Sequence, residues 1–258
     1  MLKYILTNVF FILLLLLLAL ASFYVVIDVR YFVFVGILWF IIVFIGSSFI
    51  GSNYHVKTFC SNPLITEKKI AITFDDGPNE MTAAVLEVLK KYDVKAAFFC
   101  IGKNIESHPE ILTETIKQGH AIGNHSYSHS PFFDFYSKAK IIVEIEKTDA
   151  LIETILGRKT TLFRPPYGVT NPSIRKALAV TRHKTIGWNI RSLDGVFKNR
   201  KFLLDRIIKR IKPGGIVLLH DTSIETVNVL EQLLSFLEKN NYSVVPLEEL
   251  LNIKAYEN

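Results

Sequence analysis

The stretch IAITFDDGP, residues 70–78, decides the fold. It begins with a short apolar, β-like run, residues 70–74, and ends in two carboxylates, a glycine and a proline. Taken alone, Asp75-Asp76-Gly77-Pro78 would most often be a simple turn, because Asp and Gly favour the backbone angles of turns. The two carboxylates indicate a functional site only if polar residues also follow other strands of the same sheet.

Outward from this stretch, strand-like and helix-like segments alternate. The further predicted strands are residues 95–101, 120–124, 161–163, 184–188, 216–219 and 243–246. The predicted helices are residues 82–91, 109–118, 138–156, 172–180, 202–211 and 225–239. Repeated βα units with apolar strands predict an α/β fold with a parallel sheet of about seven strands, open or closed into a barrel.

Polar side chains follow four of these strands. They are Asp75-Asp76, His125 with His129, Arg164-Pro165-Pro166-Tyr167-Gly168, and His220-Asp221. Each group alone has an ordinary explanation, such as a rigid turn or a solvated strand end. In βα sheets and barrels, however, functional groups gather at the carboxyl ends of the strands. Four such ends therefore indicate one shared site.

An Asp and two His would supply three metal ligands and leave a position for water, as in a hydrolytic zinc centre. His125 and His129 are four residues apart, a spacing that lets two side chains share one face of a helical turn. A second Asp that is not needed as a ligand could accept the proton of that water. The pattern therefore predicts metal-assisted hydrolysis.

Four motifs resemble, in order, those of the polysaccharide deacetylases, the NodB-type members of carbohydrate esterase family four. They are TFDDGP (73–78), HSYSH (125–129), RPPYG (164–168) and LLH (218–220), and the resemblance spans about residues 68–250. It implies a distorted (β/α) barrel with fewer than eight strands. It also implies metal-dependent removal of an acetyl group from the nitrogen of an aminosugar.

The resemblance implies a role for each matching residue. Asp75 would be the general base. One divalent metal, most simply zinc, with cobalt, nickel or manganese as alternatives, would be bound by Asp76, His125 and His129. His220 would be the general acid that protonates the leaving amine.

The remaining roles concern positioning and substrate contact. The backbone amide of Tyr167 would be the oxyanion donor. Arg164 would orient Asp75 and would itself pair with Asp194. Substrate contacts are expected from Tyr167, from Pro165 and from Leu218, which would line the acetyl pocket.

The stretch Trp188–Gly195 departs from the family pattern. Gly195 stands where a tryptophan usually forms the wall of the groove, and Arg191 stands where a second Asp is common. No ligand, base or acid is missing, so we expect the chemistry to survive. The groove is expected to be more open and more basic, which leaves the identity of the substrate open.

Residues 1–56 are predicted to form a membrane anchor, and residues 57–258 the catalytic domain. The runs 4–27 and 31–54 contain no charge, and each exceeds the roughly 20 apolar residues that cross a bilayer. We expect an integral membrane protein with two spans, roughly 4–27 and 31–50, joined by the three-residue turn 28–30. The alternative is a signal peptide cleaved after residues 19–21, although the apolar run continues past that point.

Two spans place both ends of the chain on one side of the membrane. Four lysines flank the spans on that side, Lys3, Lys57, Lys68 and Lys69, against Arg30 alone at the turn. This count favours the cytoplasm. The resemblance favours the outside, where most substrates of the family lie, and we expect the extracytoplasmic side.

The composition excludes several classes of protein. Half of the 258 residues are hydrophobic, and the mean hydropathy of +0.29 is too high for a plain cytosolic globule. A net charge of +6 beside 24 acidic residues is too small to indicate nucleic acid. Two cysteines, Cys60 and Cys100, do not suit a disulfide scaffold. Seven basic residues between 198 and 212 form either a solvated helix face or a surface for anionic lipid.

The leading expectation is a membrane-anchored, metal-dependent deacetylase. It would hydrolyse the N-acetyl group of N-acetylglucosamine-type residues in a glycan such as peptidoglycan or a chitin-like oligomer. One alternative is a deacylase or deformylase of a lipid-linked aminosugar, and another is a non-catalytic glycan-binding relative. The expected partners are accordingly an acetylated glycan or lipid-linked sugar and membrane lipid.

Overall fold

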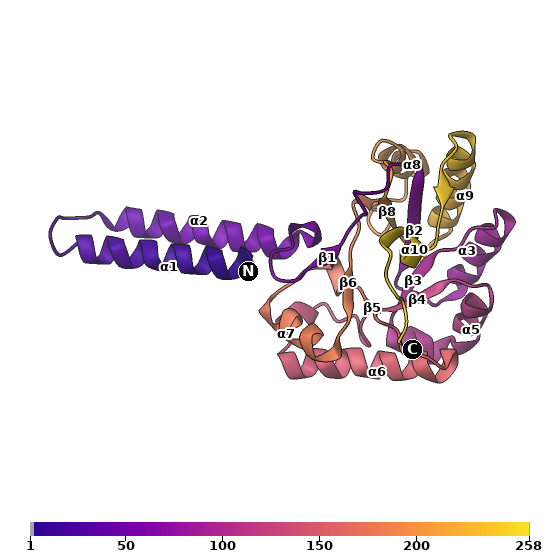
Figure 1. Ribbon diagram of the computed structural model, residues 1–258, viewed down its shortest axis with the longest axis horizontal. Coiled ribbons are helices and arrows are strands. Elements are labelled where there is room, and N and C mark those ends of the chain that lie inside the picture. The colour runs from indigo at the N-terminus through magenta and orange to yellow at the C-terminus, as the bar shows by residue number, and fades with distance from the viewer. Residues whose placement is uncertain (1–2, 258) are drawn as a thin grey trace.

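Two long apolar helices project from one side of an α/β body (Figure 1). The computed structural model describes residues 3–257, and the helices are α1 (Lys3–Ala21) and α2 (Val29–Ser48). With 19 and 20 residues, each is about 30 Å long, which is long and apolar enough to cross a membrane. They pack antiparallel, and the Trp39 indole Nε1 donates to the Asn8 Oδ1 across their interface (2.9 Å).

A nine-stranded sheet forms the centre of the body. Its strand order is β1-β6-β5-β4-β3-β2-β8-β7, all pairs are parallel, and β9 pairs with the start of β2. The strands are β1 (Thr58–Phe59), β2 (Lys69–Asp75), β3 (Ala97–Cys100), β4 (Ala121–Asn124), β5 (Leu162–Phe163), β6 (Lys184–Ile186), β7 (Ile190–Arg191), β8 (Gly215–His220) and β9 (Ser243–Val244). Because β1 and β7 are the two ends of this order, the sheet does not close into a complete barrel, and it forms a curled half-barrel. The expected distorted barrel is confirmed.

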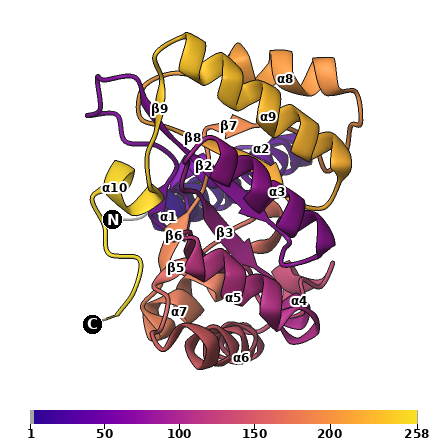
Figure 2. The same ribbon diagram turned by 90° about the vertical axis from the view of Figure 1, so that its right-hand side faces the viewer.

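Helices cover the outer face of the sheet (Figure 2). They are α3 (Glu80–Lys91), α4 (Gly102–Ser107), α5 (Pro109–Lys117), α6 (Lys138–Leu156), α7 (Pro172–Thr181), α8 (Arg200–Ile208) and α9 (Ile224–Lys239). The short α10 (Leu247–Leu251) packs instead against the inner face, where its leucines contact the cluster that contains Ala71 and Phe99. Three 3₁₀ turns lie at Ile50–Ser52, Phe133–Phe135 and Pro166–Gly168. Sequence analysis did not predict four short elements, α4, α10, β1 and β7. Their two to six residues are too few to show a periodic pattern.

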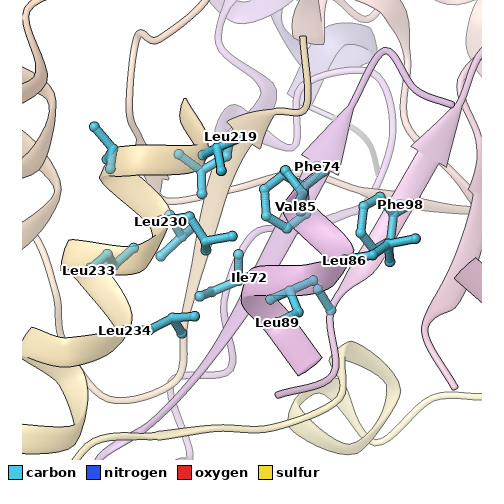
Figure 3. Close-up of a cluster of buried hydrophobic side chains, with 14 of the residues drawn as sticks. Ile72, Phe74, Val85, Leu86, Leu89, Phe98, Leu219, Leu230, Leu233 and Leu234 are labelled. Atoms are coloured by element: carbon cyan, nitrogen blue, oxygen red, sulfur yellow. The ribbon is translucent and has the colours of Figure 1, made fainter. Parts of the chain in front are cut away.

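The main core fixes the two strands that carry catalytic candidates. Side chains of β2 and β8 pack against α3 and α9 (Figure 3). The rings of Phe74 and Phe98 stack with their centroids 5.0 Å apart. Each fully buried side chain of this size contributes about 1.5–3 kcal/mol through removal from water. In the register that results, Asp75 and His220 are direct partners across β2 and β8.

The connection between the two long helices differs from the expected three-residue turn. It comprises residues 22–28, and Asp28 is the N-cap of α2 rather than part of a tight turn. Its carboxylate accepts from the Arg30 backbone amide at 2.8 Å and from the Arg30 guanidinium at 2.6 Å. The capping preference of Asp places the helix start there, and the apolar residues before it form an exposed loop.

The segment after α2 is folded onto the body rather than free. The Thr170 backbone amide donates to the Ser47 carbonyl (3.0 Å), and the Ser47 hydroxyl lies 2.9 Å from the buried His55 Nε2. Gly46 packs directly against the Tyr54 ring, so that a Cβ at Gly46 would collide with it. The loop that follows the RPPYG motif is thereby attached to the end of α2.

Candidate active site

The carboxyl ends of the strands surround one cavity of about 280 Å³. Seven of the residues singled out from the sequence line it, namely Asp75, Asp76, His125, His129, Tyr167, Leu218 and His220. Arg191 and Gly195, where the chain departs from the family pattern, also line the cavity, together with Gly168, Trp188, Leu193 and Val196. The structure thus brings together side chains that are up to 145 positions apart (from Asp75 to His220).

Asp76, His125 and His129 form a group that could hold a metal ion. One ligand atom from each lies within 4.8 Å of the others. The Asp76 Oδ1 is 3.6 Å from the His125 Nε2 and 3.5 Å from the His129 Nε2. Tetrahedral zinc with bonds of about 2.0–2.2 Å puts neighbouring ligand atoms roughly 3.3–3.6 Å apart. These two separations therefore fit a tetrahedral centre.

Two further observations favour a cation at this point. The Asp76 Oδ1 is buried and has no hydrogen-bond partner among the described residues, which is costly unless another group satisfies it. The His125 Nδ1 lies 2.7 Å from the Arg164 carbonyl, so that nitrogen carries the proton and donates. The Nε2 is then free to bind a metal. Burial lowers the pKa of His129, which favours its neutral, ligating form.

The loops that carry these residues have unusual backbone angles. Asp76, Ser126, His129 and Tyr167 have φ values of 78°, 65°, 45° and 59°. Residues other than glycine rarely adopt this left-handed region, and such strain gathers at functional sites. Surrounding hydrogen bonds hold the loops in place. The carboxylate of Glu144, on α6, accepts from the backbone amide of Ser128 at 2.7 Å.

Arg164 holds Asp75 in a buried ion pair. The Arg164 Nη1 lies 2.6 Å from the Asp75 Oδ1, and the two residues are 0% and 3% exposed. The same guanidinium donates to the Thr73 hydroxyl (2.9 Å) and to the Ile186 and Gly187 carbonyls (3.2 and 3.1 Å). This matches the orienting role that the resemblance implies for Arg164.

The expected pair of Arg164 with Asp194 is wrong. Within residues 3–257, the polar contacts of Asp194 go to other groups, and its Oδ1 lies 2.7 Å from the His220 Nδ1. Its Oδ2 accepts from the His220 backbone amide (2.8 Å) and from the Thr226 hydroxyl (2.9 Å). Asp194 follows β7, which pairs with β8, and so it reaches His220 rather than Arg164, which belongs to the opposite part of the half-barrel.

The contact with Asp194 sets the charge of His220. Burial alone would lower the His220 pKa, but the hydrogen bond and negative charge of Asp194, with smaller contributions from Asp75 and Asp76, raise it to about 9. His220 is therefore protonated at neutral pH and can donate a proton from Nε2 into the cavity.

The RPPYG turn exposes Tyr167 and buries the two prolines. Tyr167 is 47% exposed, and its ring packs edge-on against His129 with 4.9 Å between centroids. Pro165, expected to contact the substrate, is buried and does not line the cavity. Its carbonyl accepts from the Gly168 backbone amide (3.1 Å), so it shapes the turn instead. Leu218 does line the cavity, as expected.

Sequence reasoning assigned no role to several buried polar residues behind the cavity. Asp221 is fully buried, and its carboxylate accepts from the Thr82 hydroxyl (2.6 Å). Burial raises its pKa to about 7. It packs against Gly77, where any Cβ would collide with it. The only sequence signal for Asp221 was a charged residue at the end of an apolar strand. Thr73 stands in the TFDDGP motif but was given no role, and Glu144 gave no signal.

Comparison with known proteins places this site in a family. A profile described as polysaccharide deacetylase matches residues 65–186. A peptidoglycan-N-acetylglucosamine deacetylase of Bacillus cereus is 34% identical over 194 residues, which cover 73% of this chain and 90% of that protein. The chain belongs to the polysaccharide deacetylase family. The resemblance drawn from the motifs is confirmed.

Other members of the polysaccharide deacetylase family share the fold. PdaC of Bacillus subtilis, a peptidoglycan-N-acetylmuramic acid deacetylase, is 33% identical over 73% of this chain, which spans only 40% of PdaC. The PdaC structure matches with a TM-score of 0.67 at 33% identity, over 73% of this chain and 91% of that one. BA3943 of Bacillus anthracis, described as a CE4 family pseudoenzyme, matches with a TM-score of 0.68 at 31% identity, over 74% and 66%.

The ion pair between Arg164 and Asp75 can be tested by stability. Arg164→Met is expected to destabilise the full chain by about 3–5 kcal/mol, because it leaves the Asp75 carboxylate buried and unpaired. Adding Asp75→Asn removes that charge, so the double variant should be more stable than Arg164→Met alone. Thermal unfolding in a non-ionic detergent, followed by circular dichroism, measures both.

The exposed Arg200 provides the control for this experiment, since Arg200→Met is expected to change stability by no more than about 0.5 kcal/mol. If the loss of stability in the Arg164→Met, Asp75→Asn double variant equals the sum of the losses in the two single variants, the pair is not energetically coupled.

Proposed function

We propose that the protein is a metal-dependent N-deacetylase of peptidoglycan aminosugars. The observation that carries this proposal is the placement of a base candidate, Asp75, and an acid candidate, His220, opposite each other beside the group Asp76, His125 and His129. Amide hydrolysis needs a group that takes a proton from water and another that gives one to the leaving nitrogen. The relatives named above as peptidoglycan deacetylases supply the substrate class.

Asp75 acts as the general base in this proposal. Its Oδ1 is occupied by Arg164 (2.6 Å), which leaves the Oδ2 facing the His125 Nε2 at 3.8 Å. The ion pair keeps the carboxylate in one orientation, so that it can accept the proton of a water beside the metal group. A divalent metal held by Asp76, His125 and His129, with zinc the best match to these ligands, would acidify that water and polarise the amide carbonyl.

His220 acts as the general acid, and Tyr167 supports the developing charge. His220 enters the reaction protonated because Asp194 holds its Nδ1 and raises its pKa. It can then protonate the amine nitrogen as the carbon–nitrogen bond breaks. The Tyr167 backbone amide follows two prolines in a fixed turn, which suits a donor aimed at an oxyanion. Leu218 lines the same cavity and supplies apolar surface for the acetyl methyl group.

The completeness of this set favours an enzyme over a non-catalytic relative. A base, an acid and three possible metal ligands all line one cavity. The existence of a CE4 family pseudoenzyme among the matched structures makes turnover the decisive measurement.

Two substitutions separate metal binding from proton transfer. In the full chain, His125→Ala is expected to abolish stoichiometric zinc, because it removes one of three ligands. Asp75→Asn should retain the metal and lower the turnover of acetylated glycan by about 10²–10⁴-fold, the usual share of general acid–base catalysis. Elemental analysis and released acetate provide the readouts. Full zinc in His125→Ala, or unchanged turnover in Asp75→Asn, would refute the respective assignment.

The acid role of His220 predicts a specific pH dependence. A general acid must be protonated, so turnover should fall as pH rises through the His220 pKa of about 9. Asp194→Asn removes the charge that raises this pKa, so the alkaline limb should move to lower pH by about one to three units. The pH profile of turnover measures this shift, with the exposed Asp205→Asn as a control that should leave the limb in place. An unmoved limb in Asp194→Asn would exclude His220 as the acid.

We further propose that α1 and α2 cross the membrane as a hairpin, with the catalytic domain on the extracytoplasmic side. Only 6% and 11% of their apolar windows are buried by the rest of the protein, so both helices need another apolar environment. A cleaved signal peptide would account for α1 but leave α2 exposed. Peptidoglycan lies outside the membrane, which supports the extracytoplasmic side.

Cysteine labelling tests the hairpin. In a chain that lacks Cys60 and Cys100, single cysteines are placed at Tyr24, in the exposed loop between the helices, and at Lys239, on the catalytic domain. A hairpin puts these sites on opposite sides, so a membrane-impermeant maleimide should label Lys239→Cys but not Tyr24→Cys in intact cells. Labelling of both or neither would refute the hairpin, and the reverse pattern would place the active site in the cytoplasm.

A further inference from the structure

One wall of the cavity carries positive charge that no acidic side chain neutralises. Arg191 is exposed and lines the cavity, with its guanidinium 5.7 Å from the centroid of the Trp188 ring. No carboxylate forms an ion pair with Arg191, Arg206 or Arg210 within residues 3–257. Asp194, which follows the same strand β7, is already bound to His220. The wall is therefore available to an anion from solution.

The arginines are held together by the backbone. The Arg206 Nε donates to the Arg191 carbonyl (2.9 Å), and the Arg210 Nη1 donates to the Arg206 carbonyl (3.1 Å). Burial, together with the positive charges of Arg210 and Arg191, lowers the pKa of Arg206. Burial is the largest cause of that pKa shift, and mutual repulsion among the like charges adds to it. An anion bound at Arg191 would relieve this repulsion as well as gain a charged hydrogen bond.

The same wall has room beside the proposed acid. Gly195 lines the cavity, and a Cβ built there would lie 3.7 Å from the His220 ring. The glycine thus leaves open the space that a side chain would fill. A substituent on the sugar next to the scissile amide can enter here without displacing His220.

We propose that this cavity selects an aminosugar that carries an anionic substituent, bound by the Arg191 guanidinium. The inference rests on the proposed function, because it names the substrate class of the same site. Arg206 and Arg210 add to the positive potential without touching the sugar. A guanidinium recognises carboxylate and phosphate oxygens through two parallel hydrogen bonds.

Two substrate groups share this chemistry. Of the two aminosugars in peptidoglycan, only the muramic acid unit carries a carboxylate, on the ether group next to the acetamido carbon, and it is free where no peptide is attached. A sugar linked to lipid carries phosphate at its anomeric carbon instead. The acetamide and the ether that carries the muramyl carboxylate are on neighbouring ring carbons, and Arg191 and His220 both line the cavity that would hold them.

The test compares substrates that differ only in charge. The full chain, loaded with zinc in a non-ionic detergent, is given an N-acetylmuramic acid disaccharide without peptide, and the same disaccharide with its carboxyl group reduced to an alcohol. N-Acetylglucosamine 1-(methyl phosphate) and the methyl glycoside of N-acetylglucosamine form the phosphate pair. We expect kcat/KM to favour one anionic member over its neutral partner by about tenfold, the worth of one charged hydrogen bond.

Arg191→Gln should remove this preference by lowering kcat/KM for the anionic member to about that of its neutral partner. Lys209→Gln is the matched control, because it removes one exposed charge at the C-cap of α8, the helix that carries Arg206, and it should keep the full preference. Both substitutions are at exposed positions, and thermal unfolding checks that the chains remain folded. A preference in the muramyl pair assigns the anion as carboxylate, and one in the phosphate pair assigns it as phosphate.

Two outcomes would overturn the inference while the proposed function stands. One is equal kcat/KM within both pairs, and the other is a preference that survives Arg191→Gln. If no substrate is deacetylated, the proposed function fails by itself. The anion site is then tested by calorimetry, which measures the affinity of the unsubstituted chain for the muramyl disaccharide and for its alcohol. Equal affinities for the two would overturn the inference.

Discussion

The buried ion pair between Arg164 and Asp75 is the interaction on which the site depends. Strand pairing does not close this sheet, since β1 and β7 end it. The Arg164 side chain, 0% exposed, leaves the end of β5 and crosses the interior to β2 and to the end of β6. A buried charge is tolerated only when paired and hydrogen-bonded. The guanidinium therefore links β5 to the end of β6 through Nε and Nη2, while its Nη1 fixes Asp75.

Around this brace, each reactive group has its own support on a different element. The Arg164 carbonyl orients His125, Glu144 on α6 holds the loop between the two histidines, and Asp194 after β7 holds His220. These supports keep loops with left-handed backbone angles in place, which the loops would not adopt alone. The cavity is thus preorganised by contacts that converge from several strands, and a change in one support is expected to disturb one function.

The sequence was enough to predict the fold class, most helices and strands, and the residues that meet at the cavity. Those predictions rest on continuous apolar runs and on what directly follows them. It was not enough to predict the partner of Asp194, because that depends on where β7 pairs, and a two-residue strand has no pattern of its own. The burial of Pro165 and the roles of Thr73 and Asp221 depend on side-chain direction, which motif spacing does not encode.

The Thr170 backbone amide donates to the Ser47 carbonyl, and Thr170 lies two positions after the RPPYG turn. This hydrogen bond therefore joins the end of α2 to the turn. Fully extended, residues 50–68 would let a tethered domain wander over about 60 Å. Folded onto the body, they hold the cavity at a constant height above the ends of the helix pair. With the proposed hairpin in a membrane, the cavity would reach only those glycan strands that lie within a fixed distance of the bilayer surface.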